Sequence, residues 1–161
     1  MASVLIRPAS SDDAAAIARV YMESAEHHAT IDPEHCEVPD RAAIEERYRQ
    51  GRQHPDSESP AITLVAELGG EIVGFLDAQI QLPFDPMLRR TPYCFIADVA
   101  VAATHRGHGV GEQLMQVVET WAREQHAGFV SLIYNTGNSR VTAFYSRLGF
   151  APVSVGLMKP L

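Results

Sequence analysis

The sequence predicts one α/β domain over residues 1–161, built on a mixed sheet with helices on both faces. A length of 161 residues fits a single domain, and 46% hydrophobic with 20% charged residues is typical of a globular chain. Apolar residues recur at strand spacing in some segments and at helix spacing in others, in the order β-α-α-β-β-β-α-β-α-β. This alternation favours a layered α/β fold.

The first part of the chain predicts one short strand and two helices. Residues 3–7 have the composition of a strand. Ser10 and Asp13 have the spacing of a capping box, so a helix is expected directly after them. A second helix is expected from about Asp40, because two apolar residues follow at helical spacing. The polar residues 51–60 then predict a loop.

The middle of the chain predicts a β-hairpin followed by a loop. Residues 61–68 and 71–82 are rich in strand-forming residues. Gly69 and Gly70 between them take positive φ angles without a steric penalty, which suits a two-residue turn. Residues 83–92 contain three prolines and two arginines, so a loop is expected there.

The second half predicts strands that alternate with helices. Residues 93–101 are largely apolar on both sides, as expected for a central strand covered on each face. Residues 110–125 carry an apolar stripe and predict an amphipathic helix. The other expected elements are a strand at 129–134, a helix at 138–148, and a last strand at 151–159, or two strands with a bend at Gly156.

The composition bounds the partners and the compartment. A net charge of −7 opposes nucleic acid as a partner, since phosphate binding needs a basic surface, and it is compatible with a cationic amine. No run approaches the ~20 apolar residues of a membrane helix, so no membrane partner is expected. Cys36 and Cys94 imply no disulfide, and no signal pattern opens the sequence, so the expected compartment is the cytoplasm.

Three glycines stand between an expected strand and an expected helix: Gly107, Gly109 and Gly111. The first amides of a helix have no internal acceptor and carry partial positive charge, so this turn favours an anion. Arg106 and His108 add donors beside it. The spacing fits neither a Walker loop nor a dinucleotide fingerprint. On its own, the pattern is equally compatible with a flexible strand-to-helix turn.

Two motifs carry a resemblance to a known family. They are Arg106-x-x-Gly109-x-Gly111 and Asn138-x-x-Val141-x-x-Phe144-Tyr145-x-Arg147-x-Gly149-Phe150. Their residues and their order resemble the GCN5-related N-acetyltransferase (GNAT) superfamily, with Val141 and Arg147 in place of the usual Ala and Lys. The resemblance covers essentially the whole chain. It implies a mostly antiparallel sheet and acetyl-CoA as cosubstrate, held between the fourth and fifth strands.

The resemblance also implies a set of residues that contact the cofactor. Backbone groups of Val99 and Val101 are expected to pair with the pantetheine arm, as an added strand would. Asn138 is expected to hydrogen-bond the same region. The pyrophosphate is expected at the amides of the loop and the helix that follows, with these residues around it: Arg106, Gly107, His108, Gly109, Val110, Gly111 and Glu112.

The catalytic expectations rest on the same resemblance. Tyr145 matches the family tyrosine that protonates the leaving thiolate, although an aromatic residue on the apolar stripe of a helix is also an ordinary core residue. The backbone amide of Val99 is expected to stabilise the oxyanion. Many family members carry Glu-Asp where this chain has Ala97-Asp98, so Asp98 either substitutes as the base or is a structural carboxylate.

The acceptor side is less constrained by the motifs. The first helix region of the family builds the acceptor site, so Tyr21, Glu23, His27 and His28 are expected to line it, and the last three are further candidates for the base. The alternative for His27 and His28 is a solvated helix end. No metal is expected, because the histidines near Cys36 lack zinc-site spacing.

The expected function is therefore transfer of an acetyl group from acetyl-CoA to a primary amine of a small molecule or a protein. The alternatives are a CoA-binding sensor module without turnover and an acyltransferase that uses another short acyl-CoA. Homodimers are frequent in the family, so a homodimer is compatible with the sequence, although no interface is evident in it.

Overall fold

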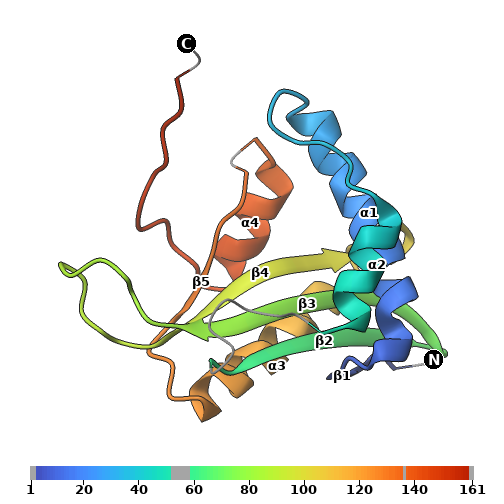
Figure 1. The fold of residues 1–161 in the computed structure, drawn as a ribbon, viewed down its shortest axis with the longest axis horizontal. Helices are drawn as coiled ribbons and strands as arrows, with labels where there is room; N and C mark the ends of the chain where they lie inside the picture. Colours follow the sequence, from blue (N-terminus) through green and yellow to red (C-terminus); the bar gives the residue numbers. More distant parts are fainter. Residues whose placement is uncertain (1–2, 52–58, 136, 160–161) are drawn as a thin grey trace.

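A five-stranded sheet runs through the protein in the order β1-β2-β3-β4-β5. The structure is a computed structural model and describes residues 3–51, 59–135 and 137–159. Its strands are β1 (Leu5–Pro8), β2 (Ala61–Leu68), β3 (Glu71–Gln81), β4 (Tyr93–Val101) and β5 (Val130–Leu132). The first four strands pair antiparallel, whereas β5 pairs parallel to β4 (Figure 1). This confirms the mixed, mostly antiparallel sheet.

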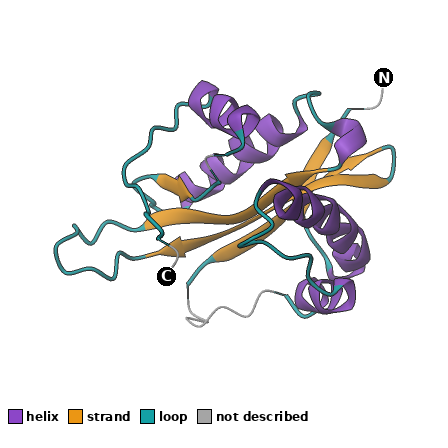
Figure 2. Cartoon of the chain, turned by 90° about the horizontal axis from the view of Figure 1, so that it is seen from above, coloured by secondary structure: helices purple, strands orange, loops and turns teal. Residues whose placement is uncertain are grey.

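Helices lie on both faces of this sheet, as the sequence predicted (Figure 2). The helices are α1 (Ala14–Ile31), α2 (Arg41–Arg49), α3 (Val110–Glu124) and α4 (Ser139–Arg147). α2 begins where the sequence predicted, and the Asp40 carboxylate caps it by accepting the Ala43 amide at 3.0 Å. A short 3-10 turn, Ser11–Asp13, precedes α1.

The two faces of the sheet carry two separate apolar clusters. One contains Leu76, Leu114 and Val118 and lies between the sheet and α3, with α4 packed against it. The other contains Ile17, Tyr48 and Phe75 and lies between the sheet and the pair α1 and α2. The division follows from alternation along β3, because successive side chains of a strand point to opposite faces.

The turns between the strands agree with the sequence pattern. Gly69 and Gly70 have φ of +60° and +86°, as the predicted two-residue hairpin requires. Residues 83–92 form a long loop that projects from the sheet (Figure 1). Of the predicted loop 51–60, residues 52–58 lie outside the described part of the chain.

The predicted last strand is wrong. Residues 151–159 have no regular secondary structure, and every one of them is exposed. Figure 1 shows this segment leaving the body of the molecule after α4. A strand is stable only when a neighbour satisfies its backbone groups, and within the described residues this segment pairs with none. The strand predicted at 129–134 is present but short, at Val130–Leu132.

An ion pair fixes the start of α1 to the sheet and predicts acid sensitivity. Arg7 donates to both oxygens of Asp13, at 2.8 and 2.9 Å, and this lowers the pKa of Asp13 from its usual 3.8 to about 2. Because the folded pKa is the lower one, the stabilisation is present above pH 4 and is lost as the pH falls towards 2. Between pH 4 and pH 2, the free energy of unfolding should therefore fall by about 1–2 kcal/mol less in Asp13→Asn than in the wild type, as measured by urea unfolding.

The matched control for this experiment is Asp12→Asn, because Asp12 is an exposed carboxylate on the same turn. It should keep the wild-type dependence of the unfolding free energy on pH. An Asp13→Asn protein with the wild-type slope between pH 4 and 2 would contradict the assignment.

Candidate active site

The glycine loop lies where the sequence placed it, between the end of β4 and the start of α3. Gly107 and Gly109 both have φ of +79°, a conformation that residues with a Cβ rarely adopt. Gly109 is the N-cap of α3, and in the described part of the chain no side chain caps this helix end. Among these residues the first amides of α3 therefore have no intrahelical or side-chain acceptor, as an anion site requires.

Two side chains hold this loop in place. Arg106 Nε donates to the carbonyl oxygen of Val101 at 2.9 Å, which folds the loop against the end of β4. Glu23 Oε2 accepts the Ala103 amide at 2.8 Å, and the same carboxylate pairs with Arg19 at 3.7 Å. Glu23, which was expected at the acceptor site, is thus bound to the backbone just before the glycine loop.

The strands β4 and β5 separate beside this loop. Their parallel pairing covers only three residue pairs and ends at Ile96 opposite Leu132, whereas β4 continues to Val101. On the other side of β4 the register with β3 shifts between Ala78–Ile96 and Asp77–Asp98, so Ala97 has no partner and forms a bulge. Within the described residues, the second half of β4 therefore pairs with β3 on one side and with no strand on the other.

Backbone groups of β4 face this opening. Ala102 donates to the Val73 carbonyl of β3 at 2.9 Å, and backbone groups alternate in direction along a strand. The amide and carbonyl of Val99 and Val101 therefore point away from β3, towards the side where β5 has separated. The Val101 carbonyl is already bound by Arg106, so Val99 retains the freer pair of groups.

Tyr145 is buried on the α3 and α4 side of the sheet, in the apolar cluster against which Val99 and Val101 pack. Its ring contacts the rings of Tyr134, Phe144 and Phe150, with centroids 5.2–5.6 Å apart. Burial, with a smaller effect of Tyr134, raises the pKa of Tyr145 to about 12. The phenol therefore stays protonated at neutral pH, which suits both a proton donor and a core residue.

Asn138 links α4 to α1. Its Oδ1 accepts the Val141 amide at 3.3 Å as the cap of α4, and its Nδ2 lies 3.5 Å from Nε2 of His27. A second contact joins the same two regions: Asn135 Nδ2, just before α4, donates to Asp32 at the end of α1, at 3.2 Å. Of the predicted acceptor residues, exposed His27 thus lies beside Asn138.

Asp98 lies on the opposite face of β4 from Val99. It pairs with Arg47 of α2 at 3.2 Å, and Arg47 is also 3.9 Å from the fully buried Asp77 of β3. Tyr21 belongs to this face, where its ring stacks on Phe75. The predicted residues therefore divide: Val99, Val101 and Tyr145 share one face, and Asp98 and Tyr21 share the other.

Sequence reasoning missed Arg47, Asp77 and Gln79. Asp77 and Gln79 are buried on β3, and Arg47 and Tyr48 of α2 lie near Asp77. The signal was available, because Asp77 and Gln79 are the polar residues in the interior of an otherwise apolar run. Tyr48 Oη and Gln79 Oε1 are buried without a hydrogen-bond partner among the described residues. Buried polar atoms are normally paired with a protein group, an ordered water or a ligand, because burying them unpaired is costly.

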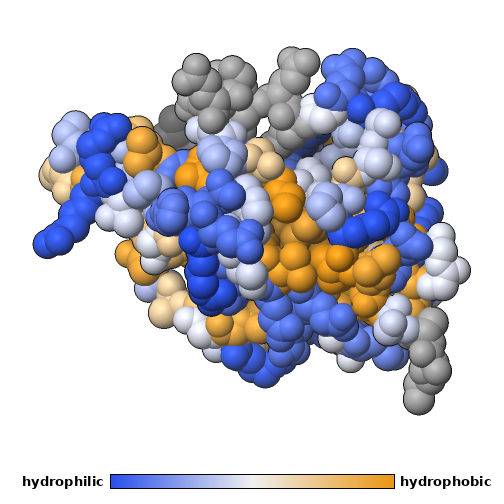
Figure 3. Space-filling model, turned by 90° about the horizontal axis from the view of Figure 1, so that it is seen from below, coloured by the Kyte–Doolittle hydropathy of each residue, from blue (hydrophilic) through white to orange (hydrophobic). Residues whose placement is uncertain are grey.

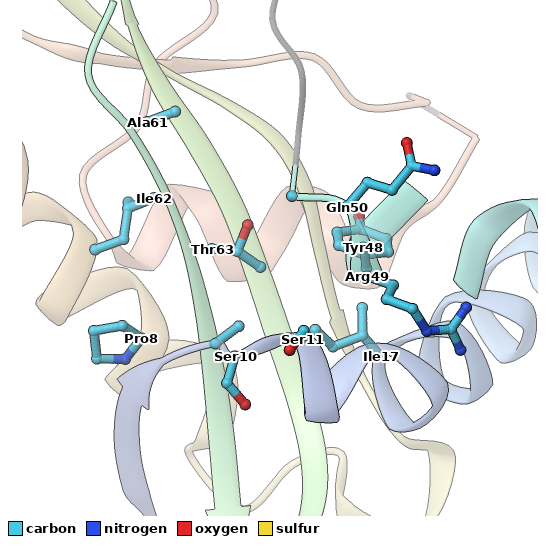
Figure 4. Close-up of a pocket in the computed structure, with 12 residues that line it drawn as sticks. Pro8, Ser10, Ser11, Ile17, Tyr48, Arg49, Gln50, Ala61, Ile62 and Thr63 are labelled. Atoms are coloured by element: carbon cyan, nitrogen blue, oxygen red, sulfur yellow. The ribbon is translucent and has the colours of Figure 1, made fainter. Parts of the chain in front are cut away.

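A pocket of about 440 Å³ lies on the α1 and α2 side of the sheet, beside β2 (Figure 4). Its wall includes Ser10, Gln50 and Thr63, and it shares Tyr48 with the polar cluster around Asp77. In the described part of the chain, no group of three His, Cys, Asp or Glu residues is arranged to hold a metal ion. Nor does any described helix have the length and apolar character of a membrane span.

A mostly antiparallel sheet whose parallel last pair separates beside a glycine-rich helix start defines the acetyltransferase class of fold. The chain belongs to the acetyltransferase (GNAT) family, whose sequence model matches residues 15–150. This confirms the family that the two sequence motifs predicted.

Curated relatives match parts of the chain. N-acetyltransferase family 8 member 2 of Rattus norvegicus is 33% identical over 88 residues, which are 53% of this chain and 37% of that protein. Streptothricin acetyltransferase of Streptomyces lavendulae is 41% identical over 56 residues, which are 35% of this chain and 30% of that protein. The matches thus span about a third of the length of these relatives.

Solved structures share the fold over nearly the whole chain. A mutant of the BH1408 protein from Bacillus halodurans has a TM-score of 0.87 at 21% identity, over 98% of this chain and 99% of that chain. The aminoglycoside N-acetyltransferase AAC(6')-Iy in complex with CoA has a TM-score of 0.72 at 17% identity, over 100% and 96% of the two chains.

Proposed function

We propose that this protein transfers an acetyl group from acetyl-CoA to a primary amine that reaches the site as a cation. The observation that carries the proposal is the separation of β4 from β5 directly beside the uncapped start of α3. This arrangement offers a strand edge for an extended arm and a helix start for a pyrophosphate. The family to which the chain belongs supports the same donor.

The donor would bind along these two elements. The pyrophosphate would lie at the amides of residues 108–112, where the glycine conformations keep side chains away from the helix start. Arg106 would supply further charge, since its Nε bond to Val101 leaves its terminal nitrogens for the phosphates. The pantetheine arm would pair with the backbone of Val99, and Asn138 would lie on the far wall of the opening.

The chemistry would be a direct transfer. The neutral amine nitrogen attacks the thioester carbon, and the Val99 amide stabilises the oxyanion that forms. The carbon–sulfur bond then breaks, and the protonated Tyr145 gives its proton to the departing thiolate. An ammonium must first lose a proton, so a base or a water chain is needed; Asp98 is our candidate, on the face from which the acceptor would arrive.

The net charge of −7 is compatible with a cationic acceptor. On the α2 side of the sheet, Arg47 pairs with Asp98 at 3.2 Å and lies 3.9 Å from Asp77, so charged groups gather there. Burial, with the two carboxylates, raises the pKa of Tyr48 above its usual value and keeps this phenol neutral. Gln79 Oε1 has no hydrogen-bond partner among the described residues, and an amide oxygen is an acceptor suited to an N–H donor.

The test is release of free thiol from acetyl-CoA over a panel of amines, with mass spectrometry of the products. We expect turnover with primary diamines or polyamines and less with weakly basic aromatic amines. CoA binding without thiol release for any amine would favour a sensor module. Faster turnover with propionyl- or succinyl-CoA than with acetyl-CoA would favour another acyl donor.

A further inference from the structure

A carboxylate of α1 is bound to the backbone that leads into the glycine loop. Glu23 Oε2 accepts the Ala103 amide at 2.8 Å, although the two residues are 80 positions apart in the chain. Ala103 opens the 3-10 turn Ala103–His105, and the glycine loop follows this turn directly. The first amides of such a turn have no acceptor inside it, so an acceptor from another element fixes where the turn begins.

The Glu23 carboxylate is itself held in place on α1. Arg19, one turn earlier on the helix, lies 3.7 Å from Glu23 Oε1. The same guanidinium donates to the Ile72 carbonyl of β3 at 2.7 Å and lies 3.1 Å from Glu71. A chain of contacts therefore runs from the start of β3 through α1 to the turn that precedes the glycine loop.

The glycine loop has little packing of its own. A Cβ placed at Gly107 or Gly109 would contact none of the described residues within 4 Å. The position of the loop therefore depends on the bonds at its ends. Arg106 supplies one of them, to the end of β4, and the bond from the Ala103 amide to Glu23 is another.

Two successive amides fix the direction in which the chain leaves β4. Ala102 donates to the Val73 carbonyl of β3 at 2.9 Å, and the next amide, that of Ala103, donates to Glu23 of α1. Because the two acceptors belong to different elements, both bonds together restrict rotation of the peptide between these residues.

We propose that Glu23 is a positioning residue for the donor: its carboxylate holds the turn Ala103–His105, and thereby the glycine loop, where the CoA pyrophosphate binds. The inference rests on the proposed function, because it requires CoA at the start of α3. It assigns Glu23 to the donor side, whereas the sequence placed this residue at the acceptor wall and among the candidate bases. Glu23 then touches neither the amine nor the pyrophosphate and acts through the backbone of the loop.

Calorimetric titration of Glu23 variants with CoA and with pantetheine tests this role. Glu23→Ala leaves the Ala103 amide without its acceptor and should weaken CoA binding on the order of 10-fold, the usual effect of losing a hydrogen bond to a charged group. Glu23→Gln keeps an acceptor oxygen and should retain most of the affinity. Pantetheine lacks the pyrophosphate, so both variants should bind pantetheine like the wild type.

The substitution Ala103→Pro shows whether the effect of Glu23 passes through this one amide. Proline suits the first position of a helical turn, because its φ is already fixed and it has no amide to satisfy. In the Ala103→Pro background, Glu23→Ala should therefore cause no further loss of CoA affinity. A loss that persists in this background would overturn the proposal, because Glu23 would then act on the stability of α1 or through another contact.

The matched control is Glu26→Ala, which removes an exposed carboxylate from the same helix. Hydrophilic residues cover much of the face seen in Figure 3, so an exposed charge is ordinary by itself. This variant should bind CoA like the wild type.

Other results would also overturn the inference. One is wild-type CoA affinity in Glu23→Ala, and another is an equal loss of affinity for CoA and for pantetheine. A raised KM for the amine in Glu23→Ala, with unchanged CoA affinity, would return Glu23 to the acceptor wall. A wild-type protein that binds no CoA would contradict the proposed function itself, and this inference with it.

Discussion

Replacement of Tyr145 by phenylalanine is expected to lower kcat by ~10²–10⁴-fold, the usual contribution of a general acid. The ring stays among Tyr134, Phe144 and Phe150, so the thermal stability and the KM for acetyl-CoA should change little. Because burial raises the pKa of Tyr145 to about 12, its deprotonation should not limit the rate below about pH 11. Steady-state kinetics at saturating amine measure the effect.

The control for this variant is Tyr134→Phe, which removes a hydroxyl from the neighbouring ring, 5.6 Å away. It should keep near wild-type turnover. If Tyr145→Phe retains wild-type kcat, then Tyr145 is a core residue and another group protonates the thiolate.

The second large effect is expected at Gly109. Asp and Asn are both good helix caps and both tolerate positive φ, so Gly109→Asp and Gly109→Asn should fold alike. They differ in charge alone. A carboxylate next to a pyrophosphate should weaken CoA binding by on the order of 100-fold relative to Asn, given the repulsion of like charges at contact distance.

Calorimetric titration with CoA measures this difference, and pantetheine, which lacks the pyrophosphate, is the internal control. The two variants should bind pantetheine equally. Equal affinities of the two variants for CoA would place the pyrophosphate away from Gly109.

Local chemistry explains why so much of the fold was predictable. The Gly69-Gly70 turn, the start of α2 near Asp40 and the apolar stripe of α3 each depend on residues close in sequence, and each is present as expected. The strand predicted at residues 151–159 is absent because a strand also depends on residues far away in sequence. Its alternating apolar pattern suits a strand, but the pattern does not specify the neighbouring strand that must pair with it.

The residues of the candidate site also fall into two groups, those in contiguous motifs and those that only the fold brings together. The glycine loop and Tyr145 belong to contiguous motifs, so the sequence alone was enough to propose them, and their roles stay predictions. The cluster of Arg47, Asp77 and Asp98 joins α2, β3 and β4, and its members are far apart in the chain. Glu23 was expected at the acceptor wall, yet its carboxylate binds the Ala103 amide, a long-range contact that no local pattern indicates.

The central claim is that the start of α3 and the β4–β5 opening hold the CoA donor, and a crystal structure of the CoA complex tests it most directly. We predict pyrophosphate oxygens within about 3.2 Å of the amides of residues 108–112. We further predict the sulfur between the backbone of Val99 and the hydroxyl of Tyr145. A CoA molecule seated elsewhere, for example in the pocket beside β2 lined by Ser10 and Thr63, would contradict the claim.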